Sequence, residues 1–354
     1  MIRPGGTIGI LGGGQLGRML TLAALRYGLK VHVFAPEACS PAFDAAAERT
    51  CAPYEDEAAL TRFARSVEAV TFEHENVPRR TAEIVGRHAP LHPGAAALAT
   101  AQDRLAEKTF VAGLDLPTAP VRAVASEAEF AEAVAIVGRP AVLKTRRFGY
   151  DGKGQVLVEA DTDLSQAWGM LWGAPCILEG YVPFESEVSV VAARTATGEF
   201  AAYDLCANEH HDHILSTTRV PAGVSPETEQ EAVTVARRIA EALDYVGVLA
   251  VEMFLVGEHV VVNEIAPRVH NSGHWTIEGA ETSQFEQHVR AVCGWPLGSA
   301  RRLGRAETRN LVGDDVETWP SVLAKPGAHL HLYGKAEARP GRKMGHVTRI
   351  EAEP

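Results

Sequence analysis

Apolar and polar positions along the first hundred residues follow a pattern that predicts strands separated by helices. Three short apolar runs, residues 7–11, 30–34 and 68–72, read as buried strands, and residues 18–27 have the periodicity of a helix. Strands that alternate with helices usually form a parallel sheet. We therefore expect a parallel α/β domain over about residues 1–95.

The next segment carries shorter elements around a glycine-rich loop, residues 146–154. We expect helices over residues 101–113 and 127–137, and strands over residues 121–125, 141–145, 155–159 and 176–179. The loop joins two of these strands, and its glycines would let it move as a lid. Residues 96–180 are therefore expected to form a small lid region.

Mixed strands and helices continue to the C-terminus. The pattern predicts strands over residues 187–193 and 200–205, helices over residues 228–243 and 283–292, and a terminal hairpin from residues 328–333 and 345–350. We expect residues 181–354 to form an α+β body that ends in this hairpin.

Two acidic residues lie at matching positions of a further predicted hairpin. Apolar, β-branched runs flank a turn at residues 256–259, and a three-residue loop there would place Glu252 opposite Glu264. Like charges opposed across a hairpin are unfavourable, and their burial costs more unless a cation lies between them. Because Mg²⁺ bound to nucleotide phosphates takes such carboxylates as ligands, we expect a magnesium–nucleotide site here. The alternative is two glutamates at an edge in solvent.

Composition narrows the class of protein. The 354 residues carry a net charge of −11, which argues against a nucleic-acid partner. There is no apolar run long enough to span a bilayer and no signal peptide, so we expect no membrane partner. The five cysteines are scattered, without a Cys-x-x-Cys pair, which is typical of the reducing cytoplasm. His210, His211 and His213 lack the spacing of a zinc site and read as loop residues.

Residues 12–17 match the pattern G-x-G-x-x-G between a strand and a helix. Such a turn directs amide groups out of a helix N-terminus and favours an anion, either a pyrophosphate or the phosphate of a nucleotide-like substrate. Glu37 lies where the ribose partner of a dinucleotide would be expected, so an NAD-dependent oxidoreductase is one interpretation. A turn without any ligand is another.

A second candidate phosphate site lies at Lys144, which ends a predicted strand just before the glycine-rich loop. The loop is not a P-loop, because G-x-x-x-x-G-K-[ST] is absent. A lysine beside a mobile flap would serve phosphates differently, although one solvated lysine at a hairpin loop fits the pattern equally well. Residues 179–182 read as a connector whose backbone would contact an adenine. Glu187 would accept ribose hydroxyls or lie in solvent.

Four motifs carry a resemblance to a known family. They are residues 10–20, the loop 149–155, residues 263–276 with the run Pro267–Trp275 inside them, and residues 339–346. Together they resemble the ATP-grasp superfamily and, within it, the N5-carboxyaminoimidazole ribonucleotide synthetases, over nearly the whole chain. The resemblance implies α/β and α+β parts in an ATP-grasp architecture: an N-terminal Rossmann-like (pre-ATP-grasp) domain, a small lid domain and a C-terminal α+β body. It also implies a homodimer.

The resemblance further implies roles for particular residues. ATP should be surrounded by Arg104, Lys144, Gly149, Tyr150, Asp151, Gly152, Lys153, Gly154, Gln155, Glu179, Gly180, Tyr181, Val182, Glu187, His210, Asn263 and Glu264. The candidate contacts to the substrates are Gln15, Leu16, Glu73, Tyr150, Asp151, Lys153, Arg268, His270, Asn271, Lys335, Arg342 and Lys343. Glu252 and Glu264 would hold Mg²⁺. The chemistry would rest on Lys144, Asp151, Arg268 and His270.

The implied reaction joins bicarbonate to an amine. ATP would phosphorylate bicarbonate to carboxyphosphate, and this, or CO₂ released from it, would carboxylate 5-aminoimidazole ribonucleotide. Lys144 and Mg²⁺ would stabilise charge on the phosphoryl group, Arg268 would hold bicarbonate, and Asp151 and His270 would handle protons. Three alternatives stay open: another ATP-grasp carboxylate–amine ligase, such as a formate-dependent glycinamide ribonucleotide transformylase; the NAD-dependent oxidoreductase; and a non-catalytic nucleotide-binding protein.

Overall fold

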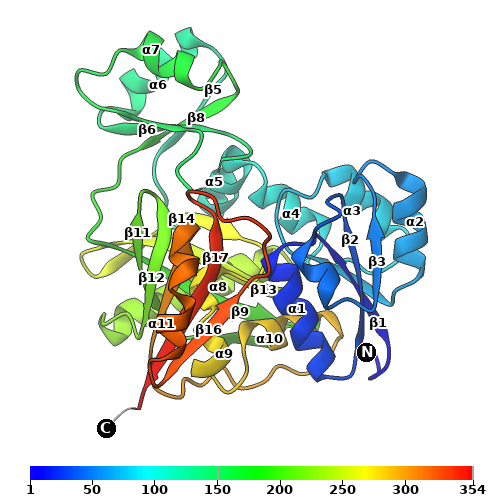
Figure 1. Ribbon diagram of the computed structural model, residues 1–354. Helices are drawn as coiled ribbons and strands as arrows, with labels where there is room; N and C mark the ends of the chain where they lie inside the picture. Colours follow the sequence, from blue (N-terminus) through cyan, green and yellow to red (C-terminus); the bar gives the residue numbers. More distant parts are fainter. Residues whose placement is uncertain (150, 353–354) are drawn as a thin grey trace.

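The computed structural model describes residues 1–149 and 151–352. In that part of the chain the strands form three sheets, in the N-terminal domain, in the lid and through the body (Figure 1). The lid stands above the other two parts in this view. None of the described helices is long and apolar enough to cross a bilayer. The expected limits of the three parts, 1–95, 96–180 and 181–354, stay predictions.

A parallel four-stranded sheet of order β3-β2-β1-β4 forms the N-terminal domain, as the alternation of elements predicted. Its elements are β1 Thr7–Leu11, α1 Gln15–Arg26, β2 Lys30–Ala35, the short 3-10 helix η1 Pro41–Asp44, β3 Glu48–Cys51, α2 Glu57–Arg65, β4 Ala69–Phe72 and α3 Arg79–Gly86. Sequence analysis missed β3, because this edge strand is mostly polar and exposed.

The helix predicted over residues 101–113 starts later in the structure, and a separate helix precedes it. α5 spans Arg104–Gly113, whereas α4, Ala95–Ala101, was not predicted. The two helices are separate because Asp103 is extended and caps α5, its carboxylate accepting two amide hydrogens of the first turn. The same carboxylate accepts hydrogen bonds from both Nε and Nη2 of Arg146, at 3.0 and 2.8 Å. Asp103 therefore links α5 to the start of the glycine-rich loop.

The lid is an antiparallel sheet of order β5-β8-β6-β7 with two helices on the side away from the body (Figure 1). Its elements are β5 Val121–Val124, α6 Glu127–Val137, β6 Ala141–Thr145, β7 Gln155–Val158, α7 Leu164–Met170 and β8 Cys176–Gly180. All four strands match the predicted runs to within one residue, whereas α7 was not predicted.

An antiparallel sheet of order β14-β13-β9-β11-β12-β15-β17-β16, with β10 beside β9, forms the body. Its strands are β9 Ser186–Arg194, β10 Phe200–Ala202, β11 Cys206–His211, β12 Ile214–Val220, β13 Gly247–Val256, β14 His259–Ala266, β15 Arg305–Val312, β16 Ala328–Leu332 and β17 Lys343–Glu351. The helices are α8 Pro226–Ala242, η2 Asn271–Gly273, α9 Thr276–Gly279, α10 Gln284–Val292, η3 Gly313–Thr318 and α11 Trp319–Leu323. The terminal hairpin is confirmed, because β16 pairs antiparallel with β17.

Two expectations about the body are wrong. The run 200–205 is not one strand, because β10 ends at Ala202 and the chain then crosses to β11. Tyr203 packs in one hydrophobic cluster and Leu205 in another. This connecting segment therefore has the alternating apolar residues that are typical of a strand, although it is not one. His210 and His211 lie in β11 and not in a loop. Sequence analysis also missed β12 and β15.

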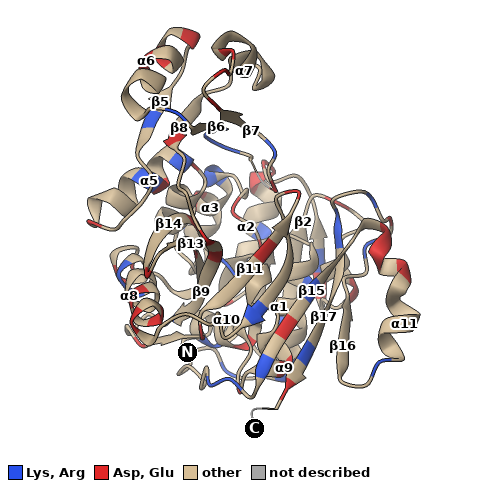
Figure 2. Cartoon of the chain, turned by 90° about the vertical axis from the view of Figure 1, so that its left-hand side faces the viewer, with Lys and Arg blue, Asp and Glu red and all other residues tan. Residues whose placement is uncertain are grey.

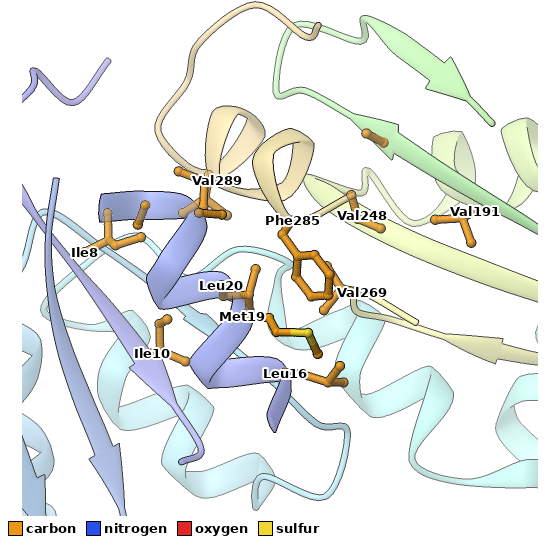
Figure 3. Close-up of a cluster of buried hydrophobic side chains, with 14 of the residues drawn as sticks. Ile8, Ile10, Leu16, Met19, Leu20, Val191, Val248, Val269, Phe285 and Val289 are labelled. Carbon is orange, nitrogen blue, oxygen red and sulfur yellow. The ribbon is translucent and has the colours of Figure 1, made fainter. Parts of the chain in front are cut away.

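One apolar cluster joins the N-terminal domain to the body. Leu16, Met19 and Leu20 of α1 lie beside Phe285 and Val289 of α10, in a cluster that also includes Val248 and Val191 of the body sheet (Figure 3). Because the same buried side chains belong to both parts, the N-terminal domain is fixed on the body over a continuous core.

A buried histidine of α10 reinforces this junction. His288 Nδ1 accepts the amide hydrogen of Val248 in β13 at 3.0 Å, and its Nε2 lies 2.7 Å from the hydroxyl of Thr71 in β4. Burial, with a smaller contribution from His92, lowers the pKa of His288 to about 3. The neutral ring therefore accepts at Nδ1 and donates at Nε2, one bond to each part.

Replacing Leu20 with alanine is expected to lower the free energy of unfolding by roughly 2–5 kcal/mol, the usual cost of such a cavity in a core. Leu20 is 1% exposed, whereas Leu22 in the same helix is 47% exposed. Leu22→Ala is therefore the matched control and should change stability little. Urea unfolding followed by circular dichroism measures both. Equal effects of the two substitutions would contradict the shared core.

Candidate active site

A cavity of about 620 Å³ lies where the lid meets the body. Figure 2 shows basic residues on α5 and the lid strands near acidic residues of the β13–β14 hairpin. Most candidate residues line this cavity: Arg104, Lys144, Gly149, Asp151, Gly152, Gln155, Glu179, Gly180, Tyr181, Val182, Glu187, His210, Glu252, Asn263, Glu264, Arg268, His270, Asn271 and Lys343. The structure thus brings together residues that are up to 239 positions apart, from Arg104 to Lys343.

The remaining candidates do not line the cavity. These are Gln15, Leu16, Glu73, Lys153, Gly154, Lys335 and Arg342, while Tyr150 lies outside the described residues. The side chain of Leu16 packs in the core shared by α1 and α10 (Figure 3), and a contact between Leu16 and the substrate stays a prediction. Apolar residues on the inner face of an amphipathic helix usually pack in the core.

The hairpin places its two carboxylates opposite each other, as predicted. Glu252 of β13 pairs directly with Glu264 of β14. The expected three-residue loop is wrong, however, because β13 ends at Val256 and β14 begins at His259, which leaves a two-residue turn. A β-bulge next to Glu252 shifts the register by one residue. This shift compensates for the turn being one residue shorter than expected. The bulge therefore keeps both carboxylates on one face of the sheet.

Each carboxylate of the hairpin has a nitrogen-bearing side chain beside it. Glu252 Oε1 lies 3.1 Å from His270 Nε2, and Glu264 Oε2 lies 3.2 Å from Arg104 Nη1. Burial would raise the pKa of Glu252, but His270, followed by His210, lowers it to about 2. Glu252 is therefore anionic at neutral pH.

This donor set fits Mg²⁺. Glu252 and Glu264 are opposed and line the cavity, and hard oxygen ligands are those that Mg²⁺ prefers. No group of three His, Cys, Asp or Glu side chains with metal-site geometry occurs among the described residues. Two carboxylates together with phosphate oxygens and water are the usual surroundings of Mg²⁺ at a nucleotide site.

A lysine and a glutamate of the lid face each other at the cavity wall. Lys144 Nζ lies 2.5 Å from Glu179 Oε2, and Lys108 of α5 lies 3.4 Å from Glu179 Oε1. Burial would raise the pKa of Glu179, but Lys144 and then Lys108 lower it to about 2. The carboxylate is thus ionised between two ammonium groups.

Helix α5 contributes a site residue that sequence analysis missed. Glu107 is 3% exposed, and its Oε1 accepts the amide hydrogen of Ile265, next to Glu264, at 2.6 Å. Burial, followed by the charge of Glu264, raises the pKa of Glu107 to about 8. Nothing in the local sequence marked Glu107 as a site residue, because its hydrogen-bond partner, Ile265, lies 158 positions away.

The run after β14 carries the predicted anion-binding side chains. Arg268 Nε lies 2.5 Å from Glu75 Oε2, and a second bond joins Nη2 to Glu75 Oε1 at 3.2 Å. Of the acidic residues after β4, Glu75 is therefore the one at the cavity. His270 Nδ1 lies 2.9 Å from the Ser272 hydroxyl, so its Nε2 is directed at Glu252.

The glycine-rich loop and the terminal hairpin meet at the same cavity. Asp151 Oδ1 lies 3.1 Å from Lys343 Nζ at the start of β17. Gly152 packs so closely on His213 that a Cβ atom there would lie 2.6 Å from its ring. His210 Nδ1 lies 3.2 Å from Glu187 Oε1. Both residues line the cavity. The lid loop is therefore in contact with the body.

Two aromatic residues that sequence analysis missed form an apolar wall. Phe184 and Phe254 both line the cavity and stack with their ring centroids 4.5 Å apart, 13° from parallel. Aromatic faces of this kind are favourable neighbours for a planar base. The sequence did not indicate a site role for Phe254, because an apolar residue at this position is typical of any half-buried strand.

The glycine turn at residues 12–17 already holds an anion from the protein itself. The amides of Gly14 and Gly17 both donate to the carboxylate of Glu73 at the end of β4, the latter at 2.7 Å. A Cβ atom at Gly12, where φ is +106°, would lie 2.4 Å from the Glu73 side chain. These two amides are therefore occupied by a carboxylate of the protein itself, and a phosphate or pyrophosphate at this turn stays a prediction. An internal carboxylate satisfies the helix N-terminus.

Comparisons with known proteins agree over the whole length. Residues 6–102 match the ribonucleotide synthetase preATP-grasp domain, residues 109–285 the ATP-grasp domain, and residues 306–354 the phosphoribosylaminoimidazole carboxylase C-terminal domain. The N5-carboxyaminoimidazole ribonucleotide synthase of Brucella melitensis is 48% identical over 353 residues, 99% of this chain and 98% of the relative. The chain belongs to the N5-carboxyaminoimidazole ribonucleotide synthase family.

Solved structures of this synthase family share the fold. The crystal structure of the Thermus thermophilus synthetase matches with a TM-score of 0.91 at 49% identity, and covers 97% of this chain and 93% of that one. The Aspergillus clavatus synthase in complex with ADP and 5-aminoimidazole ribonucleotide matches with a TM-score of 0.92 at 32% identity, over 99% and 94%. The ATP-grasp architecture with its N-terminal pre-ATP-grasp domain is thereby confirmed.

Proposed function

We propose that the protein carboxylates 5-aminoimidazole ribonucleotide with bicarbonate and ATP, releasing ADP and phosphate, in purine biosynthesis. The observation that supports this best is the single cavity at which Lys144, the Glu252–Glu264 pair and Arg268 meet. Membership of the synthase family supports the same substrates, because relatives bear this name and one solved member holds ADP and the ribonucleotide.

ATP would lie between the lid and the body, with its base against Phe184 and Phe254 and its phosphates toward Lys144. Glu252 and Glu264 would hold Mg²⁺, which when bound supplies positive charge to the phosphate oxygens. Lys144, at the end of β6, would donate to the transferred phosphoryl group as negative charge develops on it. The glycine-rich loop would cover the phosphates and exclude water, which would otherwise hydrolyse a carboxyphosphate.

Bicarbonate would bind at Arg268, whose planar guanidinium presents paired donors to a carboxylate-like anion. Glu75 holds this guanidinium in place by two hydrogen bonds. His270 and Asp151 are the candidates for moving protons, one beside Glu252 and the other beside Lys343. The ribonucleotide would extend from there toward Glu73 and Lys335, where the N-terminal domain meets β17.

The deciding assay measures ADP release with each acid and amine supplied separately. We expect ADP release to require both bicarbonate and 5-aminoimidazole ribonucleotide. Formate with glycinamide ribonucleotide should give none, and an absorbance change from a nicotinamide cofactor should be absent. ADP release that depends on formate would overturn the proposed function in favour of the transformylase.

The Michaelis constant for the ribonucleotide is expected to rise as the pH increases from about 7 to about 9. Burial, followed by the charge of Arg342, lowers the pKa of Lys335 to about 8. Lys335 is therefore protonated and attracts the 5′-phosphate below that pH, and it loses its charge above it. Lys335→Gln should raise the Michaelis constant at neutral pH and make it flat over this range. A pH dependence that persists in this variant would exclude Lys335.

A homodimer in the cytoplasm completes the proposal. The family resemblance supports the dimer, and light scattering of the purified protein tests it. The five cysteines are all free, as expected where thiols stay reduced.

A further inference from the structure

A buried lysine lies behind the lysine that is proposed to bind phosphate. Lys108 of α5 is 1% exposed, and its Nζ lies 3.4 Å from Glu179 Oε1 and 3.3 Å from the carbonyl oxygen of Val262. The other oxygen of Glu179 contacts Lys144 at 2.5 Å. Two ammonium groups therefore share one carboxylate. Of these two, Lys144 lines the cavity and Lys108 does not.

We infer that Lys108 is a positioning residue of the nucleotide site, which neutralises Glu179 so that the charge of Lys144 is left for the phosphates. The inference rests on the proposed binding of ATP and on Lys144 as its phosphate ligand. It does not depend on which acid or amine the enzyme joins.

The argument is a balance of charges. Burial lowers the pKa of Lys108, and the charge of Glu179, 3.4 Å away, opposes that shift. With both lysines protonated, Glu179 contributes one negative charge and the lysines contribute two positive charges, so the three groups together present one positive charge at Lys144. Without Lys108, the charges of Lys144 and Glu179 would cancel. A phosphate would then compete for Lys144 with a buried carboxylate 2.5 Å away, and such competition is strong where water is excluded.

Arg104 of α5 also lowers the pKa of Glu179, after Lys144 and Lys108, but the side chains of Arg104 and Glu107 make their contacts to other groups. Arg104 Nη1 is directed at Glu264, and Glu107 Oε1 accepts the amide hydrogen of Ile265. Both contacts are to β14 and concern the metal-binding hairpin. Lys108, one helical turn after Arg104, is thus the cation of α5 whose Nζ contacts the lid carboxylate directly.

A purely structural role makes a different prediction. Lys108 also donates to Val262 and so links α5 to β14. If this link were its whole function, losing it would weaken the site equally whether or not Glu179 carries a charge. If neutralisation is the function, the loss should matter only while Glu179 is charged.

A double-mutant cycle of Lys108→Met and Glu179→Gln separates the two roles. The readout is ATP binding to the full-length protein by titration calorimetry, together with the Michaelis constants of both substrates. We expect Lys108→Met to weaken ATP binding roughly 10- to 100-fold, since it leaves a charged partner uncompensated, and to leave the Michaelis constant for the ribonucleotide unchanged. In the Glu179→Gln background the same substitution should have little further effect.

Equal losses in both backgrounds would overturn the inference, as would unchanged ATP binding in Lys108→Met. If Lys108→Met does not fold, Lys108→Gln replaces it in the cycle, because its neutral amide retains a donor for Val262. A wild-type protein that binds ATP but shows no bicarbonate-dependent turnover of the ribonucleotide would refute the proposed function while the cycle still reports on Lys108. A wild-type protein that does not bind ATP would overturn both.

Discussion

Replacing Lys144 with alanine is expected to reduce turnover by roughly 100- to 1,000-fold, the usual effect of removing one preorganised donor to developing charge. The fold should survive, because Glu179 keeps Lys108 as a partner at 3.4 Å. The measurement is ADP release at saturating bicarbonate, ATP and ribonucleotide, with urea unfolding as the check on stability.

The exposed Lys325 provides a matched control for this substitution. Lys325→Ala removes the same charge from the body, far from the lid strand, and should leave turnover at the wild-type level. Turnover of Lys144→Ala within a few-fold of wild type would show that Glu179, and not a phosphate, is the functional partner of this lysine.

Replacing Glu264 with alanine is expected to be comparably severe, with a loss of turnover of roughly 100-fold or more, since it removes one of the two carboxylates proposed to hold Mg²⁺. The substitution should also raise the Mg²⁺ concentration needed for half-maximal ADP binding, which calorimetry measures without turnover. Because Glu264 opposes Glu252 directly, its removal relieves a repulsion, and the free energy of unfolding should not fall substantially.

Glu258 serves as the control on the same hairpin. It lies in the exposed turn between β13 and β14, so Glu258→Ala should change neither Mg²⁺ dependence nor turnover. If Glu264→Ala lowered stability strongly and left the Mg²⁺ dependence unchanged, the carboxylate would be a structural partner of Arg104 and not a metal ligand.

Features that depend on local pattern could be predicted from the sequence. Strand alternation and a short turn were enough to place Glu252 opposite Glu264, although the real turn is shorter and a bulge restores the pairing. Likewise, the pattern placed Lys144 near the end of a lid strand beside the glycine-rich loop, and both line the cavity. Such predictions succeed because the two-residue period of a strand fixes which side chains share a face.

Features that depend on long-range contacts could not be predicted. Glu107 and Lys108 lie in an ordinary helical pattern, yet both are buried against β14, more than 150 positions away. Periodicity reports that a helix has an inner face, but it does not report which polar groups meet there. The glycine turn shows the same limit, because its preference for an anion was evident whereas the source of that anion, Glu73, depended on how β4 pairs with β1.

The shared core beneath α1 and α10 has a consequence for redesign of the enzyme. An N-terminal segment transplanted from a relative that uses another ribonucleotide would bring its own α1 but not the α10 against which that helix packs. Phe285 and Val289 would then meet foreign side chains in place of Leu16, Met19 and Leu20. A chimera that aims to change substrate should therefore exchange α1 and α10 together, with His288 and Thr71 kept as a matched pair.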